Sequence, residues 1–228
     1  EIDPNNKYLK FYSKSKEGKV LSNFADIEVK INGKLYITGE HAFHGQKYLV
    51  ASETYNDEIL TKSDDERKEK LIKYSQLFEG KDTKFKTALD AKRAGGKSGE
   101  RLSDNEIKIW NSKKSDEIQD KICIYKYKNN KEVRDTLNKF KDYTLIHQDN
   151  RATDKTPWGA RVVTKDGVDV IIGKNKLGKT WTKIYKNEMK ETPKNNNNNN
   201  NEFNSSLNKF LKDINFKNEA ECSSGSYK

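Results

Sequence analysis

The dipeptide Asn32-Gly33 constrains the fold more than any other feature of this sequence. Apolar residues alternate with polar ones over 27–31, and a second short apolar run follows at 35–37. Both residues of the pair tolerate positive φ, so Asn-Gly between two such runs is the strongest short-range signal for a β-hairpin. The hairpin delivers the chain to Gly39-Glu40. We therefore expect Glu40 in the first turn of a helix, where a carboxylate suits the helix dipole.

Turn and cap signals divide the rest of the chain into helices and a few short strands. A strand at 8–12 is expected to join the hairpin in a small antiparallel sheet at the front of the domain. Asp166-Gly167 predicts a second hairpin, and Ser103-Asp104-Asn105-Glu106 is a capping box that opens a helix. Residue spacing also predicts helices over 54–93, 131–140 and 180–189, and a strand over 143–147. The fold class is therefore α+β, a single domain with strands and hairpins attached to a mainly helical body.

Pro193 and the asparagine run at 195–201 end this domain. A run of small polar amides cannot bury enough apolar area to order itself. We expect a domain over 1–190 and a mostly disordered tail over 191–228. An alternative for the tail is a short amphipathic helix, because apolar residues recur at helical spacing from Leu207 to Ile214. Such a helix would dock back on the domain or bind a protein partner.

The net charge of +10 raises the question of nucleic-acid binding. The positive residues are almost all Lys, they are scattered along the chain, and acidic residues lie between them, as in Lys68-Glu69-Lys70. A solvated surface explains this composition equally well. Binding to a polyanion stays open, and a phosphate-bearing ligand is favoured over a protein that reads a DNA groove.

No apolar run approaches the roughly 20 residues needed to cross a bilayer, and no signal-peptide pattern opens the sequence. The two cysteines, Cys123 and Cys222, are far apart and make neither a disulfide framework nor a zinc site. We expect a reducing compartment, either cytoplasm or nucleus, and no membrane partner.

Residues 40–47 place a carboxylate, two imidazoles and an ammonium in one short helix. At about 100° per residue, Glu40, Phe43, His44 and Lys47 share one face, and His41 is turned aside. Such a mixture is unusual for a helix that only packs, although a helix-start carboxylate and a solvated lysine remain the simpler interpretation. Two His without a third obvious ligand argue against zinc, so no metal is expected.

Three other segments have both a structural and a functional interpretation. Asn23, in Leu21-Ser22-Asn23-Phe24, is either a turn residue or a pocket amide. The loop from Asp154 to Gly159 is either held by a buried Trp158 or presents it to a ligand. The segment from Gly173 to Gly178 is either a tight connection or an anion-binding turn.

The order and spacing of these motifs closely resemble the NADAR family of YbiA-like domains, over about residues 7–189. The matching segments are Phe11-Tyr12, Leu21-Ser22-Asn23-Phe24, Gly39-Glu40-His41-Ala42-Phe43 with Lys47, Ala91-Lys92-Arg93, Trp110, Trp158-Gly159 and Gly173-x-Asn175-x-Leu177-Gly178. The resemblance implies an α+β enzyme that hydrolyses N-glycosidic bonds and needs no cofactor.

Two substrate classes follow from the resemblance: guanine bases of DNA or RNA that carry ADP-ribose, and phosphoribosylamino intermediates of riboflavin synthesis. Both are nucleotide-like, and in both a ribose C1–N bond lies near phosphate. A second hypothesis is a module that binds ADP-ribose or NAD without cleaving it. A third hypothesis is that the polar residues are structural and that the tail is the active part, recruiting partners through Leu207 to Ile214.

Matched to the family's motifs, Glu40 is the key acid, Asn23 the pocket amide and Lys47 the basic helix residue. The family's Asp-x-x-Trp-Gly is altered, since three residues separate Asp154 from Trp158. In spite of this altered spacing, Asp154 is the predicted second catalytic residue. Asp149 is a poorer substitute. His44 replaces a Gln of the family. The remaining expected substrate-binding residues are Phe24, His41, His44, Arg93, Trp158, Gly159, Asn175 and Gly178.

The chemistry asks for such residues independently of the resemblance. Cleavage of a ribosyl C–N bond passes through a cation-like transition state, which a carboxylate such as Glu40 stabilises. The departing nitrogen must gain a proton, from Asp154 or His44. Trp158 can stack on a base, while Lys47, Lys92 and Arg93, with backbone amides near Gly173 and Gly178, suit phosphate.

Overall fold

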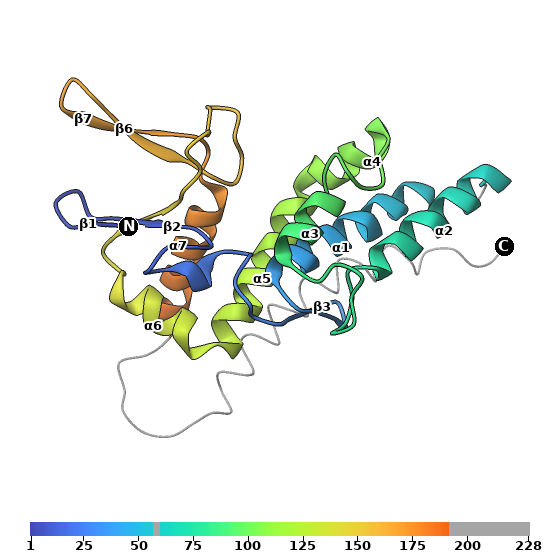
Figure 1. Cartoon of the computed structure of the whole chain (residues 1–228), viewed down its shortest axis with the longest axis horizontal. Coiled ribbons are helices and arrows are strands. Elements are labelled where there is room, and N and C mark those ends of the chain that lie inside the picture. The colour runs from blue at the N-terminus through green and yellow to red at the C-terminus, as the bar shows by residue number, and fades with distance from the viewer. Residues whose placement is uncertain (57–59, 192–228) are drawn as a thin grey trace, which may run out of the picture. The chain divides into compact units, whose positions relative to one another are not determined.

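Helix α1 (Gly39–Ser52) is the centre of the helical body in the computed structural model, which describes residues 1–56 and 60–191. It contacts α2 (Lys62–Gln76), α3 (Ala88–Ala94), α4 (Asp104–Ile109) and α5 (Ser115–Asn129). Figure 1 shows these helices gathered around α1. Then come α6 (Lys131–Lys139) and α7 (Lys176–Glu191). Three short turns lie at Lys19–Leu21 (η1), Glu53–Tyr55 (η2) and Trp110–Lys114 (η3).

The strands form three small sheets. β2 (Tyr8–Phe11) lies between β1 (Ile2–Asp3), which is antiparallel to it, and β5 (Thr144–His147), which is parallel to it. The prediction of one antiparallel sheet at the front is therefore wrong. Parallel neighbours need a long crossover, and here the helical body between residues 12 and 143 supplies it.

Both predicted hairpins are present. β3 (Val29–Ile31) pairs with β4 (Lys34–Tyr36), and β6 (Arg161–Lys165) pairs with β7 (Val168–Ile172). Asn32 and Gly33 have φ of 49° and 79°, and Asp166 and Gly167 have φ of 52° and 77°. Two central residues with positive φ define the turn that matches the right-handed twist of paired strands.

The helix predicted over 54–93 is interrupted in the structure. Thr61 and Thr87 each open a separate helix through a capping box, with Asp64 and Asp90 as the reciprocal partners. The predicted capping box of Ser103 is confirmed; its partner Glu106 is fully buried and forms an ion pair with Arg67. Helix α7 begins at Lys176, earlier than predicted.

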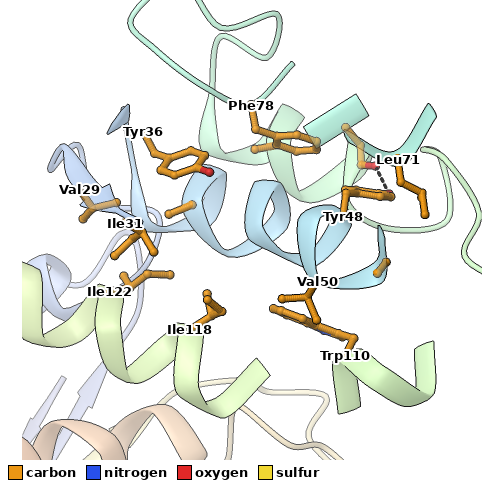
Figure 2. Close-up of a cluster of buried hydrophobic side chains, with 14 residues drawn as sticks. Val29, Ile31, Tyr36, Tyr48, Val50, Leu71, Phe78, Trp110, Ile118 and Ile122 are labelled. Atoms are coloured by element: carbon orange, nitrogen blue, oxygen red, sulfur yellow. Dashed lines mark hydrogen bonds between the residues drawn. The ribbon is translucent and has the colours of Figure 1, made fainter. Parts of the chain in front are cut away.

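The apolar core has two clusters. The first packs both sides of α1 and includes Tyr36, Tyr48, Phe78 and Ile122, all fully buried. Figure 2 shows α1 running between the side chains of Phe78 and Ile122. The second joins β2 and β5 to α5, α6 and α7, and its largest member is Trp181. The fold is α+β, as predicted.

Residues 1–189 make up one compact unit. The predicted disordered tail and the alternative amphipathic helix lie outside the described residues. Within residues 1–56 and 60–191, no helix is both long enough and apolar enough to span a membrane.

Candidate functional site

Glu40 lies at the start of α1 with its side chain nearly buried. Thr38 caps the helix, accepting a hydrogen bond from the His41 amide at 3.3 Å. The Glu40 amide donates to the Asn23 carbonyl at 2.9 Å. The Glu40 side chain is 11% exposed, and its Oε1 lies 3.2 Å from His44 Nε2. The helix start thus holds a carboxylate that is largely removed from water and faces an imidazole.

The predicted polar face of α1 is confirmed at His44 and Lys47, which both pack against Gly95. A Cβ added to Gly95 would lie only 2.0 Å from His44 Nδ1, so the ring rests directly on that backbone. Nδ1 of His44 has no hydrogen-bond partner among the described residues. The Lys47 ammonium donates to the Gly95 carbonyl, and burial lowers the pKa of Lys47 to about 8.

His147, at the end of β5, lies close enough to Glu40 for that charge to act on its pKa, although its sequence context did not single it out. Its Nδ1 lies 3.2 Å from the Trp158 carbonyl, so Nδ1 must carry the hydrogen and Nε2 is left as an acceptor. Its ring stacks on Phe11 at 5.4 Å. Burial lowers the pKa of His147, opposed by that hydrogen bond and by the charge of Glu40.

Aromatic rings and lysines surround these groups. The Phe43 ring meets the Trp158 ring edge to face at 5.4 Å. Lys92 Nζ lies 5.4 Å from the centre of the Phe24 ring, and its charge lowers the pKa of His147. Lys176 Nζ lies 5.4 Å from the Trp158 ring. A flat, anionic ligand would find both stacking surfaces and cations here.

Asn23 is brought to this group, and its side-chain amide pairs with that of Gln119. Its Nδ2 donates to Gln119 Oε1 at 2.7 Å, and Gln119 Nε2 donates back to Asn23 Oδ1 at 3.0 Å. The paired amides fix the backbone whose carbonyl receives the Glu40 amide. The geometry makes Asn23 a residue that positions the start of α1.

His41 is fully buried and turned away from Glu40, as its place on the helix predicted. Its Nε2 donates to the Phe85 carbonyl at 2.7 Å, and its Nδ1 lies 2.8 Å from the Thr38 hydroxyl. Burial lowers the pKa of His41, which favours the neutral ring. With both nitrogens engaged inside the core, His41 has no donor or acceptor to offer a ligand.

The segment from Gly173 to Gly178 forms a tightly packed corner between β5 and α7. Asn175 is buried; its Oδ1 accepts from the His147 amide at 3.0 Å and its Nδ2 donates to the Leu145 carbonyl at 2.8 Å. A Cβ on Gly178 would lie 2.1 Å from the Leu145 carbonyl oxygen. These contacts hold the backbone of β5 at His147 in position.

Four backbone amides of that corner are also occupied. The amides of Lys174, Asn175, Lys176 and Leu177 donate to carbonyls of the loop from Thr156 to Gly159. Gly159 is buried, and a Cβ there would lie 2.8 Å from the Cβ of Asp149. The start of α7 therefore binds the Trp158 loop, and these amides are not available to a phosphate.

Asp154 and Arg93 are not brought into the group. Both are exposed and have no side-chain hydrogen bond or ion pair to another described residue. Asp149 and Lys92 lie closer to it, since the charges of both influence the pKa of His147. The catalytic role of Asp154 stays a prediction, without structural support from its position.

Among residues 1–56 and 60–191, no group of three or more His, Cys, Asp or Glu side chains gathers closely enough to hold a metal ion. A hollow of about 480 Å³ is lined by Phe24, Thr38 and residues 86–89 among others, and Glu40, His44 and His147 are not among the residues that line it.

The architecture matches that of a solved protein. The NMR structure of the E. coli protein YbiA is 24% identical in sequence and superposes with a TM-score of 0.51, covering 84% of this chain and 90% of YbiA. No protein-family model matches the sequence, and no curated protein matches it. The similarity covers almost all of the described domain. This chain therefore has the YbiA fold.

Proposed function

We propose that this protein is an N-glycosidase that hydrolyses a ribose C1–N bond in a phosphorylated, nucleotide-like substrate. The observation that carries the proposal is the nearly buried Glu40 carboxylate, which faces His44 and whose charge acts on the pKa of His147. The motifs that resemble the NADAR family and the YbiA fold support it. The substrate is either guanine-linked ADP-ribose or a phosphoribosylaminopyrimidine.

Glu40 would stabilise the positive charge that develops on the ribose ring as the C1–N bond breaks. A carboxylate that is largely shielded from water interacts more strongly with such a charge than a solvated one. The Asn23 carbonyl and the Thr38 cap fix the first turn of α1, so the carboxylate is held before substrate arrives.

His147 would move the proton. Water attacks C1, its proton passes to the free Nε2 of His147, and the electron pair of the C1–N bond goes to the departing nitrogen. That nitrogen then takes the proton from His147. A neutral ring is needed to accept the proton, and burial favours the neutral form of His147.

The lysines would bind phosphate. Lys92 is exposed above the Phe24 ring, and Lys176 lies over Trp158, where it also pairs with Asp116 at 2.7 Å. Lys47 is partly buried with a single carbonyl as hydrogen-bond acceptor. A phosphate oxygen near Lys47 would offset the cost of burying its charge.

The proposal is tested by incubating the protein with guanine-linked ADP-ribose on DNA and, separately, with a phosphoribosylaminopyrimidine. Free base is measured by chromatography, and binding of ADP-ribose by calorimetry. We expect released base from one of the two. Saturable binding of ADP-ribose without any release of base would contradict the proposal and favour the binding module. A chain truncated after Pro193 should keep the activity.

A further inference from the structure

The two oxygens of the Glu40 carboxylate have different surroundings. Oε1 lies 3.2 Å from Nε2 of His44, one helical turn further along α1. The i, i+4 spacing brings two such side chains together on a helix. Oε2 has no hydrogen-bond partner among the described residues, and it is not one of the side-chain atoms that are buried there without a partner. Oε1 therefore faces an imidazole, whereas Oε2 keeps contact with solvent.

The His44 ring is enclosed by the side chains and backbone around it. Its Nδ1 packs against the end of α3, where a Cβ on Gly95 would lie only 2.0 Å away. The Phe43 ring meets it edge to face at 5.6 Å, and the centre of the Phe78 ring lies 6.4 Å from it. The side chain is 12% exposed. A ring packed in this way has little freedom to turn, so Nε2 stays directed at Glu40.

The contacts of the two ring nitrogens of His44 determine which one carries the hydrogen. A neutral imidazole has one N–H and one lone pair. With the hydrogen on Nδ1, a buried donor would have no acceptor among the described residues, and the lone pair of Nε2 would face the Glu40 carboxylate. A doubly protonated ring would bury the same unpaired Nδ1–H, which is costly. The form that fits both contacts has its hydrogen on Nε2, which donates to Oε1.

We infer that His44 is a positioning residue for the proposed N-glycosidase, whose Nε2–H fixes Glu40 Oε1 so that Oε2 is the oxygen that faces ribose C1. The inference rests on the proposed function, because it takes Glu40 as the group that stabilises the charge on the ribose ring. It also removes His44 from the candidates for donating a proton to the leaving nitrogen, since its one N–H is committed to Glu40.

The matched variants His44→Gln and His44→Met isolate this hydrogen bond. Their side chains have similar length and flexibility, and only Gln has an N–H that can donate to Oε1. On the substrate that the unchanged protein cleaves, we expect His44→Gln to keep kcat near its original value. His44→Met should lose about 10- to 100-fold, the effect of a misplaced reacting group. KM and the affinity for ADP-ribose should stay the same in both variants, because the hydrogen bond orients Glu40 and does not hold the ligand.

The pair of variants distinguishes positioning from the two other roles that His44 could have. If the ring only filled space, Gln and Met would have the same effect. If it transferred a proton, His44→Gln would be as slow as His44→Met and would lose a limb of its pH profile, since an amide does not titrate. Equal kcat values for the two variants would therefore overturn the inference.

The hydrogen on Nε2 is observed directly by nitrogen–proton correlation NMR of the full chain labelled with ¹⁵N-histidine. The chain has three His. His41 donates from Nε2 to a carbonyl and His147 donates from Nδ1 to another, so they provide a reference for each tautomer. The spectrum of His44→Gln assigns the His44 signals. We expect His44 to match His41, and a hydrogen on Nδ1 of His44 would overturn the inference.

These outcomes are separable from that of the proposed function. Without release of base from either ribosyl substrate, the proposed function and the catalytic role of His44 both fail, and the NMR spectrum still decides whether His44 donates to Glu40. If base is released and the Gln and Met variants are equally fast, the proposed function stands and the role of His44 alone is lost.

Discussion

The polar face of α1 and the corner around Asn175 are both prominent in the sequence, and they differ in how their polar groups are satisfied. At the corner, the Asn175 side chain and the backbone amides of Lys174, Asn175, Lys176 and Leu177 are hydrogen-bonded inside the protein. On α1, His44 Nδ1 has no hydrogen-bond partner among the described residues, and the Lys47 ammonium has one hydrogen-bond acceptor, the Gly95 carbonyl. Unsatisfied groups near a buried carboxylate indicate a ligand, whereas a complete network indicates architecture.

Within the candidate site, which includes His147 on β5, the largest expected effect is that of His147→Gln. If Nε2 accepts the proton of the attacking water, kcat should fall about 10²- to 10⁴-fold. Burial lowers the pKa of His147, so kcat/KM of the unchanged enzyme should decline below the ordinary titration range of His. In His147→Gln this acid limb should be absent. Kinetics between pH 4 and 8 measure both quantities, and an unchanged acid limb would exclude His147 as the proton acceptor.

The corresponding change at the corner is Asn175→Ala. It leaves the buried His147 amide and Leu145 carbonyl without partners, at a cost of about 2–5 kcal/mol in the free energy of unfolding. Urea denaturation measures this loss. The exposed Asn105→Ala should change it by no more than about 0.5 kcal/mol. Stability equal to that of Asn105→Ala would mean that the corner is not held by this amide.

The partly buried ammonium of Lys47 on α1 should make the free energy of unfolding depend on pH. Burial lowers the pKa of Lys47 from 10.5 to about 8, so between these values the unfolded chain holds a proton that the folded chain has lost. The free energy of unfolding therefore rises from pH 8 to 10.5, with up to about 3 kcal/mol due to Lys47. Urea denaturation should show a smaller rise in Lys47→Met. An equal rise in both proteins would place that titration elsewhere.

The smallest expected effect separates two neighbouring cations. Lys92 lies over Phe24 and acts on His147, while Arg93 is exposed with no described partner. Lys92→Met should raise KM about tenfold, equivalent to about 1.4 kcal/mol of binding, and Arg93→Met should leave it unchanged. Steady-state kinetics with the phosphorylated substrate test this, and the reverse ranking would support the sequence-based choice of Arg93.

Local signals account for the parts of the fold that were predicted correctly. Asn32-Gly33, Asp166-Gly167 and the capping box of Ser103 each fix their own backbone within a few residues. The break between α2 and α3 was missed, although Thr61 with Asp64 and Thr87 with Asp90 carry the same capping signal. The parallel pairing of β2 with β5 has no local signal, because the helical body separates the two strands in the sequence.

The candidate site likewise contains residues that local sequence predicts and residues that only the tertiary structure identifies. Helical periodicity is enough to bring Glu40, His44 and Lys47 to one face and to turn His41 into the core. His147 is separated from Glu40 by about a hundred residues and lies on β5, whose parallel pairing with β2 has no local sequence signal. It is one of three His in the sequence, and its place at the end of a predicted strand was the signal available. The prediction of Asp154 rested on motif spacing, and a choice between Asp154 and Asp149 needs the geometry of the loop, which spacing does not encode.

Glu40→Gln tests the central claim most directly, because it removes the charge and keeps the size of the side chain. Release of base is followed in a single turnover on the substrate that the unchanged protein cleaves, with calorimetry of ADP-ribose and urea denaturation as controls. We predict that release slows by about 10³-fold. ADP-ribose binding should be retained and the unfolding free energy should stay within about 1 kcal/mol. A Glu40→Gln protein that releases base at the unchanged rate would contradict the account.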